Sequence, residues 1–258
     1  MSDELRLEIG AGVATLTIDR PAKRNAISFE MWSRLPEITA EVERSGAEVL
    51  VVRGGEHFSA GADISEFTTL RAGAEGAERY AAAVHLGERA LAGLSVPTIA
   101  AINGFCIGGG CEIALACDIR LAAEDATFGI TPAKLGLVYH FTSTRALVHA
   151  VGPAWAKQIL FSGEFIDAST ALRIGLVNEI HPGEALGKRV DELAATIGSR
   201  AQVSLRGAKT IIGRIQDGLD SEDRAVTELY ANAHTSAEYA EGVAAFLEKR
   251  KPSFRDVR

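Results

Sequence analysis

Apolar and polar side chains alternate at the start of the chain. Apolar residues are spaced two apart over residues 5–9, and residues 13–18 continue the alternation after a glycine-containing turn at residues 10–12. A period of two is typical of β-strands, in which successive side chains point to opposite faces. The pattern therefore predicts two strands joined by a tight turn.

Helical and strand-like segments then follow one another. Ser28 is a typical N-cap, and the apolar residues after it recur at helical spacing, which predicts a helix over residues 29–43. Apolar runs bounded by turn residues predict strands at 49–52, 97–102, 119–122 and 177–180, and helices at 77–94 and directly after residues 108–110. Strands that alternate with helices indicate an α/β fold with crossover connections.

The pattern changes near Gly183. From there on, helical periodicity predominates and strand-forming residues are few. The predicted helices cover residues 186–197, 203–215, 222–233 and 237–250. We therefore expect an α/β core over residues 1–182 and a helical region over residues 183–258.

Composition and charge narrow the class of protein. The chain has 258 residues, of which 47% are hydrophobic and 24% charged, and this excludes disordered and fibrous proteins. With 27 basic and 34 acidic residues the formal net charge is −7, whereas a general nucleic-acid binder has a basic surplus. No run approaches the about 18 apolar residues of a membrane helix. We expect neither a nucleic-acid nor a membrane partner.

The cysteines and the N-terminal residues indicate the cellular compartment in which the protein is expected. Cys106, Cys111 and Cys117 are odd in number and lack C-x-x-C spacing, so neither a disulfide framework nor a metal site is expected. Asp3 and Glu4 stand where a secretory signal would be basic. Both observations favour the cytoplasm.

Two glycine-containing loops are the first candidates for chemistry. Residues 55–63 follow a predicted strand, and residues 103–112 lead from a strand through three glycines into a helix. Small residues let a ligand approach backbone amides, and the first amides of a helix have no intrahelical partner. Together the loops could bind a developing oxyanion. The alternative is that these glycines serve only tight turns and close packing.

Other catalytic motifs are missing. Residues 10–15 lack the third glycine of a dinucleotide-binding fingerprint, and the sequence contains no G-x-x-x-x-G-K-[ST], H-E-x-x-H or G-x-S-x-G. The histidines at 57, 85, 149, 181 and 234 stand alone, and a lone histidine is more often structural than catalytic.

Several segments carry a family resemblance. They are IDRP with NA at residues 18–26, FSAGAD at 58–63, NG through GGGCE at 103–112, ACD at 116–118, ALRIGLV at 171–177 and FLEKRKPSF at 246–254. With these segments the chain resembles the crotonase, or enoyl-CoA hydratase/isomerase, superfamily over nearly its whole length.

The resemblance implies a spiral of β-β-α turns with a helical C-terminal region that forms trimers, often as a dimer of trimers. It also implies a coenzyme A thioester as substrate, with no separate cofactor and no metal. The family's oxyanion-hole amides match Ala62 and Gly109. Its coenzyme A contacts match residues in the first loop, before it and near the C-terminus: Ala60, Asp63, Ile64, Lys23, Arg24 and Lys249. In relatives, a basic residue at the position of Lys249 reaches the coenzyme A phosphates of a neighbouring subunit; a solvated helix face is the alternative for Lys249.

Two positions decide the reaction class. The family's first catalytic glutamate matches Glu112, in the first turn of the helix after the glycines; a carboxylate there could also serve only the helix dipole. The second catalytic glutamate matches Pro132, and no Asp or Glu occurs between Asp125 and Glu164. Proline exchanges no proton, so two-carboxylate hydration is not expected to operate in its usual form.

Residues 131–139 suggest a different branch. Their pattern, T-P-x-x-L-G-x-x-Y, is similar to that of methylmalonyl-CoA decarboxylase, in which the tyrosine helps hold the substrate carboxylate. Tyr139 takes that place, and His140 follows it. Loss of CO₂ leaves the thioester enolate directly, so decarboxylation needs an oxyanion hole more than a second acid–base carboxylate. Packing at a subunit boundary is the alternative for both side chains.

Two classes of function remain open. The first is an acyl-CoA lyase or isomerase of fatty acid metabolism, for which hydration, isomerisation, decarboxylation and hydrolysis compete. The second is a non-catalytic member that binds an acyl-CoA or a partner. Some relatives bind RNA. The net negative charge of this chain argues against RNA binding here.

Overall fold

The computed structural model describes residues 4–257, so Asp3 lies outside the described residues. The strands are β1 Leu5–Gly10, β2 Val13–Ile18, β3 Val49–Arg53, β4 Thr98–Ile102, β5 Phe105–Ile107, β6 Ile119–Ala123, β7 Thr127–Gly129, β8 Ile166–Asp167 and β9 Glu179–His181. The α-helices are α1 Phe29–Ser45, α2 Phe67–Leu70, α3 Gly73–Ala92, α4 Gly109–Ala116, α5 Phe141–Ser162, α6 Ala168–Arg173, α7 Gly183–Gly198, α8 Gln202–Gln216, α9 Arg224–His234 and α10 Ala237–Leu247. Short 3₁₀ turns are η1 Pro21–Lys23, η2 Ile64–Glu66, η3 Pro132–Leu135 and η4 Phe254–Val257.

Two sheets organise the core. The larger has the strand order β1-β2-β3-β4-β6-β9, in which β1 and β2 are antiparallel and the other neighbours are parallel. The smaller has the order β5-β7-β8. The predicted hairpin at residues 5–18 is confirmed.

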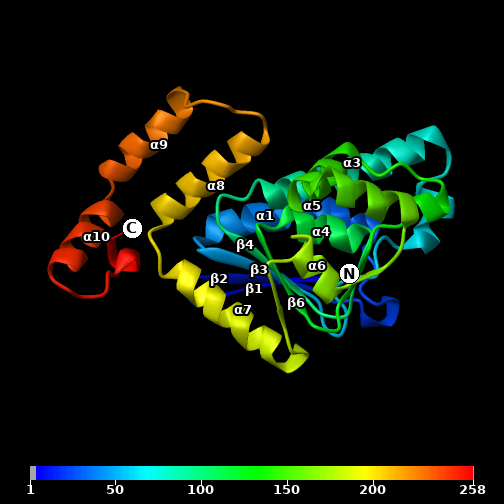
Figure 1. Ribbon diagram of the computed structural model, residues 1–258, viewed down its shortest axis with the longest axis horizontal. Coiled ribbons are helices and arrows are strands. Elements are labelled where there is room, and N and C mark those ends of the chain that lie inside the picture. Colours follow the sequence, from blue (N-terminus) through cyan, green and yellow to red (C-terminus); the bar gives the residue numbers. More distant parts are fainter. Residues whose placement is uncertain (1–3, 258) are drawn as a thin grey trace.

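Alternation along the strands separates the two faces of the large sheet. Leu50 and Val52 of β3 face the main core beneath α1 and α3, whereas Val49 and Val51 face a second cluster beneath α7. Figure 1 shows α7 on one side of the sheet and α1 with α3 on the other. All four side chains are buried, because a parallel strand between two helical layers has no solvent-facing side.

The chain repeats a β-β-α turn. A strand of the large sheet leads into a strand of the small sheet and then into a helix: β4, β5 and α4 form one turn, and β6, β7 and α5 the next. An earlier turn follows the same path, because Ser59 after β3 forms a parallel bridge to Cys106 before the chain reaches α3. The predicted spiral of β-β-α turns is confirmed.

Several elements differ from the sequence prediction. The predicted helix at 77–94 begins at Gly73, and the last strand lies at 179–181 rather than 177–180. The three strands of the small sheet were not predicted, because strands of two or three residues are too short to show an alternation. Nor was α5, which contains Gly152-Pro153. Gly152 has φ 74° and ψ 163°, so two helical segments meet there at a kink.

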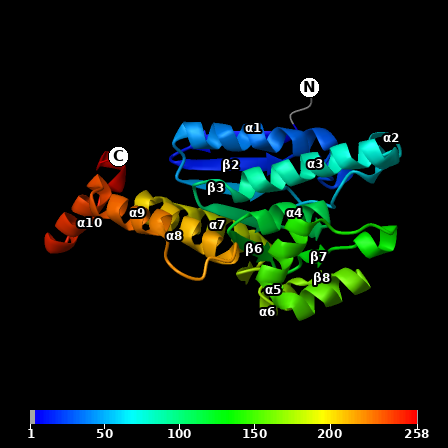
Figure 2. The ribbon, with the colours of Figure 1, turned by 90° about the horizontal axis from the view of Figure 1, so that it is seen from above.

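The C-terminal helices fall into two groups. Leu186, Val190 and Ala194 of α7 pack on the large sheet. By contrast, α8, α9 and α10 extend away from the sheet in both views (Figures 1 and 2). The helical region that projects from the core thus begins after α7, and the predicted domain boundary at residue 183 stays a prediction. In residues 4–257, none of the helices combines the length and apolar character needed to cross a bilayer.

Candidate active site

A pocket of about 130 Å³ lies where the β-β-α turns meet. Its walls come from α1, the 60–67 segment, α3, the start of α4, η3 and the segment before α5. The lining residues are Trp32, Ala60, Gly61, Ala62, Ile64, Phe67, Arg71, Tyr80, Val84, Ile107, Gly108, Gly109, Glu112, Thr131, Pro132, Leu135, Leu137, Val138, Tyr139 and His140. Both glycine-containing loops predicted from the sequence therefore contribute to one pocket.

The first loop presents the amide of Ala62. Gly61 has φ 103°, a conformation that glycine adopts without strain. Ala62 forms a parallel bridge with Ile27, and the hydrogen bonds of this bridge use the N–H groups of Ile27 and Asp63. The N–H of Ala62 itself is therefore not used in pairing, and Ala62 lines the pocket.

The second loop presents the amide of Gly109. Gly108 is the N-cap of α4, with φ 48° and ψ −110°, a conformation unsuited to residues with a Cβ. As the first residue of α4, Gly109 has an N–H with no partner inside the helix. Figure 1 shows α4 in the centre of the core, beneath α3 and α5.

These two amides lie close together. A Cβ at Gly109 would lie 3.4 Å from the Ala62 nitrogen and 3.6 Å from Glu112 Oε2. Two free N–H donors can stabilise an oxygen atom that gains negative charge. A carboxyl group lies beside them. The geometry thus brings together Ala62, Gly109 and Glu112, three of the residues predicted from the sequence.

Glu112 is held largely away from water. Burial raises the pKa of its carboxyl group, and the nearby carboxyl group of Glu88 raises it further, while Arg71 acts in the opposite direction. A carboxyl group of this kind retains its proton at pH values where an ordinary glutamate is ionised. Glu112 can therefore act as a proton donor as well as a base.

Behind Glu112 lies a second carboxyl group that the sequence analysis did not identify. Glu88 of α3 is 4% exposed, and its Oε1 accepts a hydrogen bond of 2.5 Å from Ser143 Oγ. Ser143 Oγ also lies 3.4 Å from Glu112 Oε1. Burial raises the pKa of Glu88 as well.

The segment before α5 closes the opposite side of the pocket. Pro132 lines it, so no carboxylate reaches the pocket from this position. Tyr139 places its hydroxyl in the interior, where it is buried without a hydrogen-bond partner. Burial and the neighbouring Glu112 raise the pKa of this tyrosine. Burial and the charge of Arg71 lower the pKa of His140.

One cation lies in the wall of the pocket. The Arg71 guanidinium lies over the rings of Phe67 and Tyr80, with 4.4 Å and 5.0 Å from Cζ to the ring centroids. Stacking on aromatic rings orients a guanidinium while leaving its N–H donors available. The pocket therefore offers a positive charge to an anionic group.

The predicted coenzyme A contacts divide into two groups. Ala60 and Ile64 line the pocket. Asp63 does not, because Arg20 (3.0 Å), Ser65 and more distantly Lys23 (3.9 Å) surround its buried carboxylate. Burial opposes ionisation of Asp63, but the hydrogen bonds from Ser65 and Arg20 outweigh it and lower the pKa.

The remaining predicted contacts lie outside the pocket. The Arg24 guanidinium lies 5.8 Å from the Phe105 ring centroid, near the strand that leads into α4. Lys249 follows α10, and α10 lies at the opposite end of the molecule from α2 (Figure 2). Within one chain, Lys249 is not brought to the pocket.

Most residues that the sequence analysis missed come from α3, from α5 and from the position directly after α2. They are Arg71, Tyr80, Glu88 and Ser143. The position of Glu88 carried a detectable signal, because it falls on the buried face of α3 with Tyr80, Val84 and Leu91. A carboxylate on the apolar face of a helix is unusual and requires a partner.

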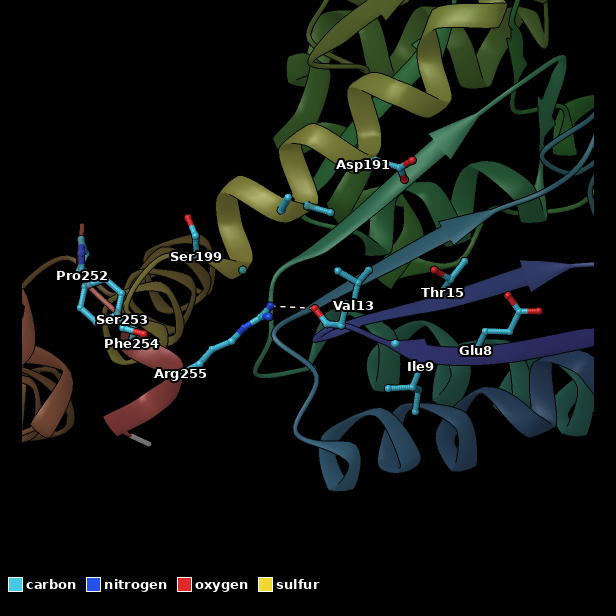
Figure 3. A pocket seen from close by; sticks show the side chains of 15 residues that line it. Glu8, Ile9, Val13, Thr15, Asp191, Ser199, Pro252, Ser253, Phe254 and Arg255 are labelled. Carbon is cyan, nitrogen blue, oxygen red and sulfur yellow. Dashed lines mark hydrogen bonds between the residues drawn. The ribbon is translucent and has the colours of Figure 1, made fainter. Parts of the chain in front are cut away.

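A larger cavity lies elsewhere. Its volume is about 780 Å³, and it lies between the surface of β1 and β2, the end of α7 and η4 (Figure 3). Arg255 crosses it to donate a hydrogen bond of 2.9 Å to the Ala11 carbonyl, and also pairs with Glu48. The smaller pocket is the better candidate for catalysis, because its walls combine the amides of Ala62 and Gly109 with the carboxyl group of Glu112. Within residues 4–257, no three His, Cys, Asp or Glu side chains are grouped to hold a metal ion.

Comparison with known proteins shows which proteins the chain is similar to. The family model described as "Enoyl-CoA hydratase/isomerase" matches residues 8–257. A crotonyl-CoA hydratase of Syntrophomonas wolfei is 34% identical over 98% of both chains, and a short-chain-enoyl-CoA hydratase of Clostridium acetobutylicum is 36% identical over 95% of both. The crystal structure of an enoyl-CoA hydratase/carnithine racemase from Magnetospirillum magneticum superimposes with a TM-score of 0.94, at 35% identity, covering 98% of this chain and 96% of that one.

Proposed function

Because the chain belongs to the enoyl-CoA hydratase/isomerase family of enzymes acting on CoA thioesters, we propose that it stabilises a thioester enolate between the amides of Ala62 and Gly109. The observation that carries this proposal is the convergence of these two free N–H groups beside Glu112. Donors fixed before the reaction stabilise the enolate oxygen more than the neutral carbonyl oxygen, and this difference lowers the barrier.

Glu112 moves the proton in the proposed reaction. In hydration of a 2-enoyl-CoA, its carboxylate accepts a proton from water as the oxygen bonds to the β-carbon. The same carboxyl group then donates a proton to the α-carbon of the enolate. No cofactor is required beyond the coenzyme A that the substrate carries, and the names of the relatives as crotonyl-CoA and short-chain-enoyl-CoA hydratases support this chemistry.

The size of the pocket supports a short acyl group. A cavity of about 150 Å³ is enough for benzene, and this pocket measures about 130 Å³. Most of its walls are aliphatic or aromatic, including Trp32, Val84 and Leu137. We therefore propose an acyl group of roughly four to six carbon atoms.

A panel of CoA thioesters tests the function. Crotonyl-CoA, longer 2-enoyl-CoAs and methylmalonyl-CoA are incubated with the enzyme, and the products are identified by mass spectrometry. Gly109→Pro removes one amide donor and is expected to lower turnover about 10²–10³-fold. Gly109→Ala is the comparison variant: it retains the N–H, and it reports the steric cost of a Cβ that would lie 3.2 Å from Trp32 and 3.4 Å from the Ala62 nitrogen.

The outcomes distinguish the two variants. Loss of turnover in the proline variant with substantial turnover in the alanine variant supports the oxyanion hole. Equal turnover in both would exclude the Gly109 amide as a donor. If no thioester in the panel binds or reacts, the chain is a non-catalytic member of the family or uses another substrate.

Decarboxylation of a malonyl-type CoA is a second candidate. Pro132 stands where a second carboxylate would act, while Arg71 and Tyr139 line the same pocket. A cation and a hydroxyl donor can hold a substrate carboxylate until the bond to the α-carbon breaks. The electron pair of that bond then forms the enolate, which the two amides would stabilise in the same way.

A further inference from the structure

Three polar side chains from three helices meet behind the pocket. Glu88 comes from α3, Glu112 from α4 and Ser143 from the first turn of α5. Glu88 and Ser143 are almost completely buried, at 4% and 1% exposed. Neither lines the pocket, so neither touches a substrate bound there.

The hydrogen count at Ser143 constrains the protonation of its neighbours. A serine hydroxyl has one hydrogen to donate. Its oxygen lies 2.5 Å from Glu88 Oε1 and 3.4 Å from Glu112 Oε1, so it meets two carboxyl oxygens at once. When the hydroxyl donates to one carboxylate, the contact with the other is favourable only if that group carries a proton and donates it to the serine oxygen.

We propose that Glu88 is the second carboxyl group of this active site, sharing a single proton with Glu112 through the hydroxyl of Ser143. The pair then has two arrangements of the proton. In one, Glu112 is protonated and donates to Ser143, which donates to the Glu88 carboxylate. In the other, both hydrogens have moved by one bond, so that Glu88 is protonated and Glu112 is the carboxylate.

The shared proton lets one carboxyl group serve as both base and acid. With the proton on Glu88, Glu112 is ionised and accepts a proton when water loses it to form the bond to the β-carbon. The O–H bond of Glu112 then breaks as the C–H bond forms at the α-carbon, and the pair returns to its starting charge. Glu88 is thus a positioning residue: it acts on the substrate only through Glu112.

The surroundings of the pair favour this arrangement. Burial of both groups, together with the charge of one on the other, disfavours the state in which both are ionised and raises the pKa of each. The other charged or titratable groups that interact with Glu112 include Arg71 after α2, Tyr80 on α3 and Tyr139 before α5. Arg71 is the cation among them. Its single positive charge favours the state of the pair in which one carboxyl group is ionised and the other is protonated.

The arrangement of the helices produces this meeting. α4 lies between α3 and α5 (Figure 2), so a side chain from each outer helix can reach Glu112. The second oxygen of Glu88 and the hydroxyl of Tyr139 are both buried without a hydrogen-bond partner. Unpartnered buried polar atoms are costly and are retained mainly where a site uses them.

The proposal rests on the proposed function for its role in turnover, but the shared proton is measurable without substrate. Infrared spectroscopy of the intact protein detects the carbonyl band of a protonated carboxyl group. We expect such a band in the parent protein at pH 7, lost on titration to alkaline pH. Glu88→Gln preserves size and can still accept from Ser143, but it removes the second charge.

In the Glu88→Gln variant, the midpoint for loss of the band is expected to fall by about 1–2 pH units, because Glu112 no longer faces another carboxylate. Ser143→Ala is the second variant, and it separates the pair without removing either carboxyl group. It is expected to change the band frequency while retaining a protonated carboxyl group. If turnover is measurable, its pH profile is expected to shift in Glu88→Gln in the same direction as the band.

Thermal unfolding provides the check on folding. A carboxyl group whose folded pKa is raised above the ordinary 4.5 stabilises the fold at acid pH, and this contribution is lost as the pH rises toward the folded pKa. We therefore expect the parent protein to lose stability between pH 5 and pH 8, and Glu88→Gln to lose less. A band and a stability profile in Glu88→Gln that superimpose on those of the parent would overturn the shared proton. A confirmed shared proton without reaction of any thioester would overturn the proposed function instead.

Discussion

At the scale of single residues, the pocket combines one protonatable carboxyl group with a proline on the facing wall. Glu112 lies beside the two free amides, and Pro132 begins the 3₁₀ turn η3 on the other side. A positioned acid–base group contributes about 10²–10⁴-fold to a rate. Hydration of crotonyl-CoA is accordingly expected to be slow compared with hydration by a two-carboxylate relative.

Pro132→Glu tests this expectation directly. It adds a carboxylate to the pocket wall and is expected to raise kcat for crotonyl-CoA hydration at least about tenfold. Pro132→Ala is the control, because it removes the ring without adding an acid. Steady-state rates followed by loss of the enoyl absorbance provide the measurement. A fast parent enzyme whose rate Pro132→Glu does not raise would show that Glu112 and its neighbours suffice.

Tyr139→Phe separates catalysis from packing. The hydroxyl of Tyr139 is buried without a hydrogen bond of standard geometry, although it lies beside Glu112 and lowers the pKa of that carboxyl group; removing it is expected to change the stability of the fold little. We expect the melting temperature to be nearly unchanged. Decarboxylation of methylmalonyl-CoA, measured by release of CO₂, is expected to fall about tenfold or more if this hydroxyl holds the substrate carboxylate. An unchanged rate would exclude the tyrosine from that role.

At the scale of elements, α5 shows how a helix can carry a break and still position a site. Its first turn supplies Ser143, and Gly152 divides the remainder at a kink with φ 74°. No side chain or backbone atom lies within 4 Å of where a Cβ at Gly152 would stand, so only the backbone conformation requires glycine. The cost of any other residue is therefore conformational strain rather than a clash.

Gly152→Ala is expected to lower the free energy of unfolding by about 1–3 kcal/mol. Gly207→Ala in α8 is the matched control: its Cβ also meets no atom within 4 Å, and it lies in a regular helix. There alanine is expected to stabilise by about 0.5–1 kcal/mol. Chemical denaturation of both variants tests the pair, and an equal effect of the two would contradict the role assigned to the kink.

At the scale of the whole molecule, the projecting region formed by α8–α10 exposes large apolar side chains. They include Ile212, Ile215, Tyr239, Val243, Phe246 and Leu247. Amphipathic helices that do not pack on their own core need another surface to cover them. This observation agrees with the trimer or dimer of trimers expected from the sequence, which stays a prediction.

Sedimentation tests the assembly. The parent protein is expected to sediment as a trimer or hexamer at micromolar concentration. Phe246 is 84% exposed in the single chain, so Phe246→Ser is expected to shift the distribution toward smaller species. Phe246→Leu, which retains the apolar character, is the control. A parent protein that sediments only as a monomer would rule out this use of the projecting region.

The sequence by itself determined the local structure and part of the site. Alternation and helical spacing located most strands and helices, because burial of one face leaves a periodic trace in the sequence. Gly108-Gly109 and the loop before Asp63 marked the two free amides, because such turns need glycine or small residues whatever surrounds them. The glycines also predicted the start of a helix, which placed Glu112 in its first turn.

Only the tertiary structure decided which buried helix faces pack against each other. Glu88 and Ser143 are 55 residues apart in the sequence, and Ser143 and Glu112 are 31 apart, yet a single hydroxyl joins them. Periodicity shows that a helix has a buried face, but the partner of that face depends on how the β-β-α turns stack. The protonation of Glu112 depends on that stacking too, because its pKa is set by burial and by a charge that arrives from another helix.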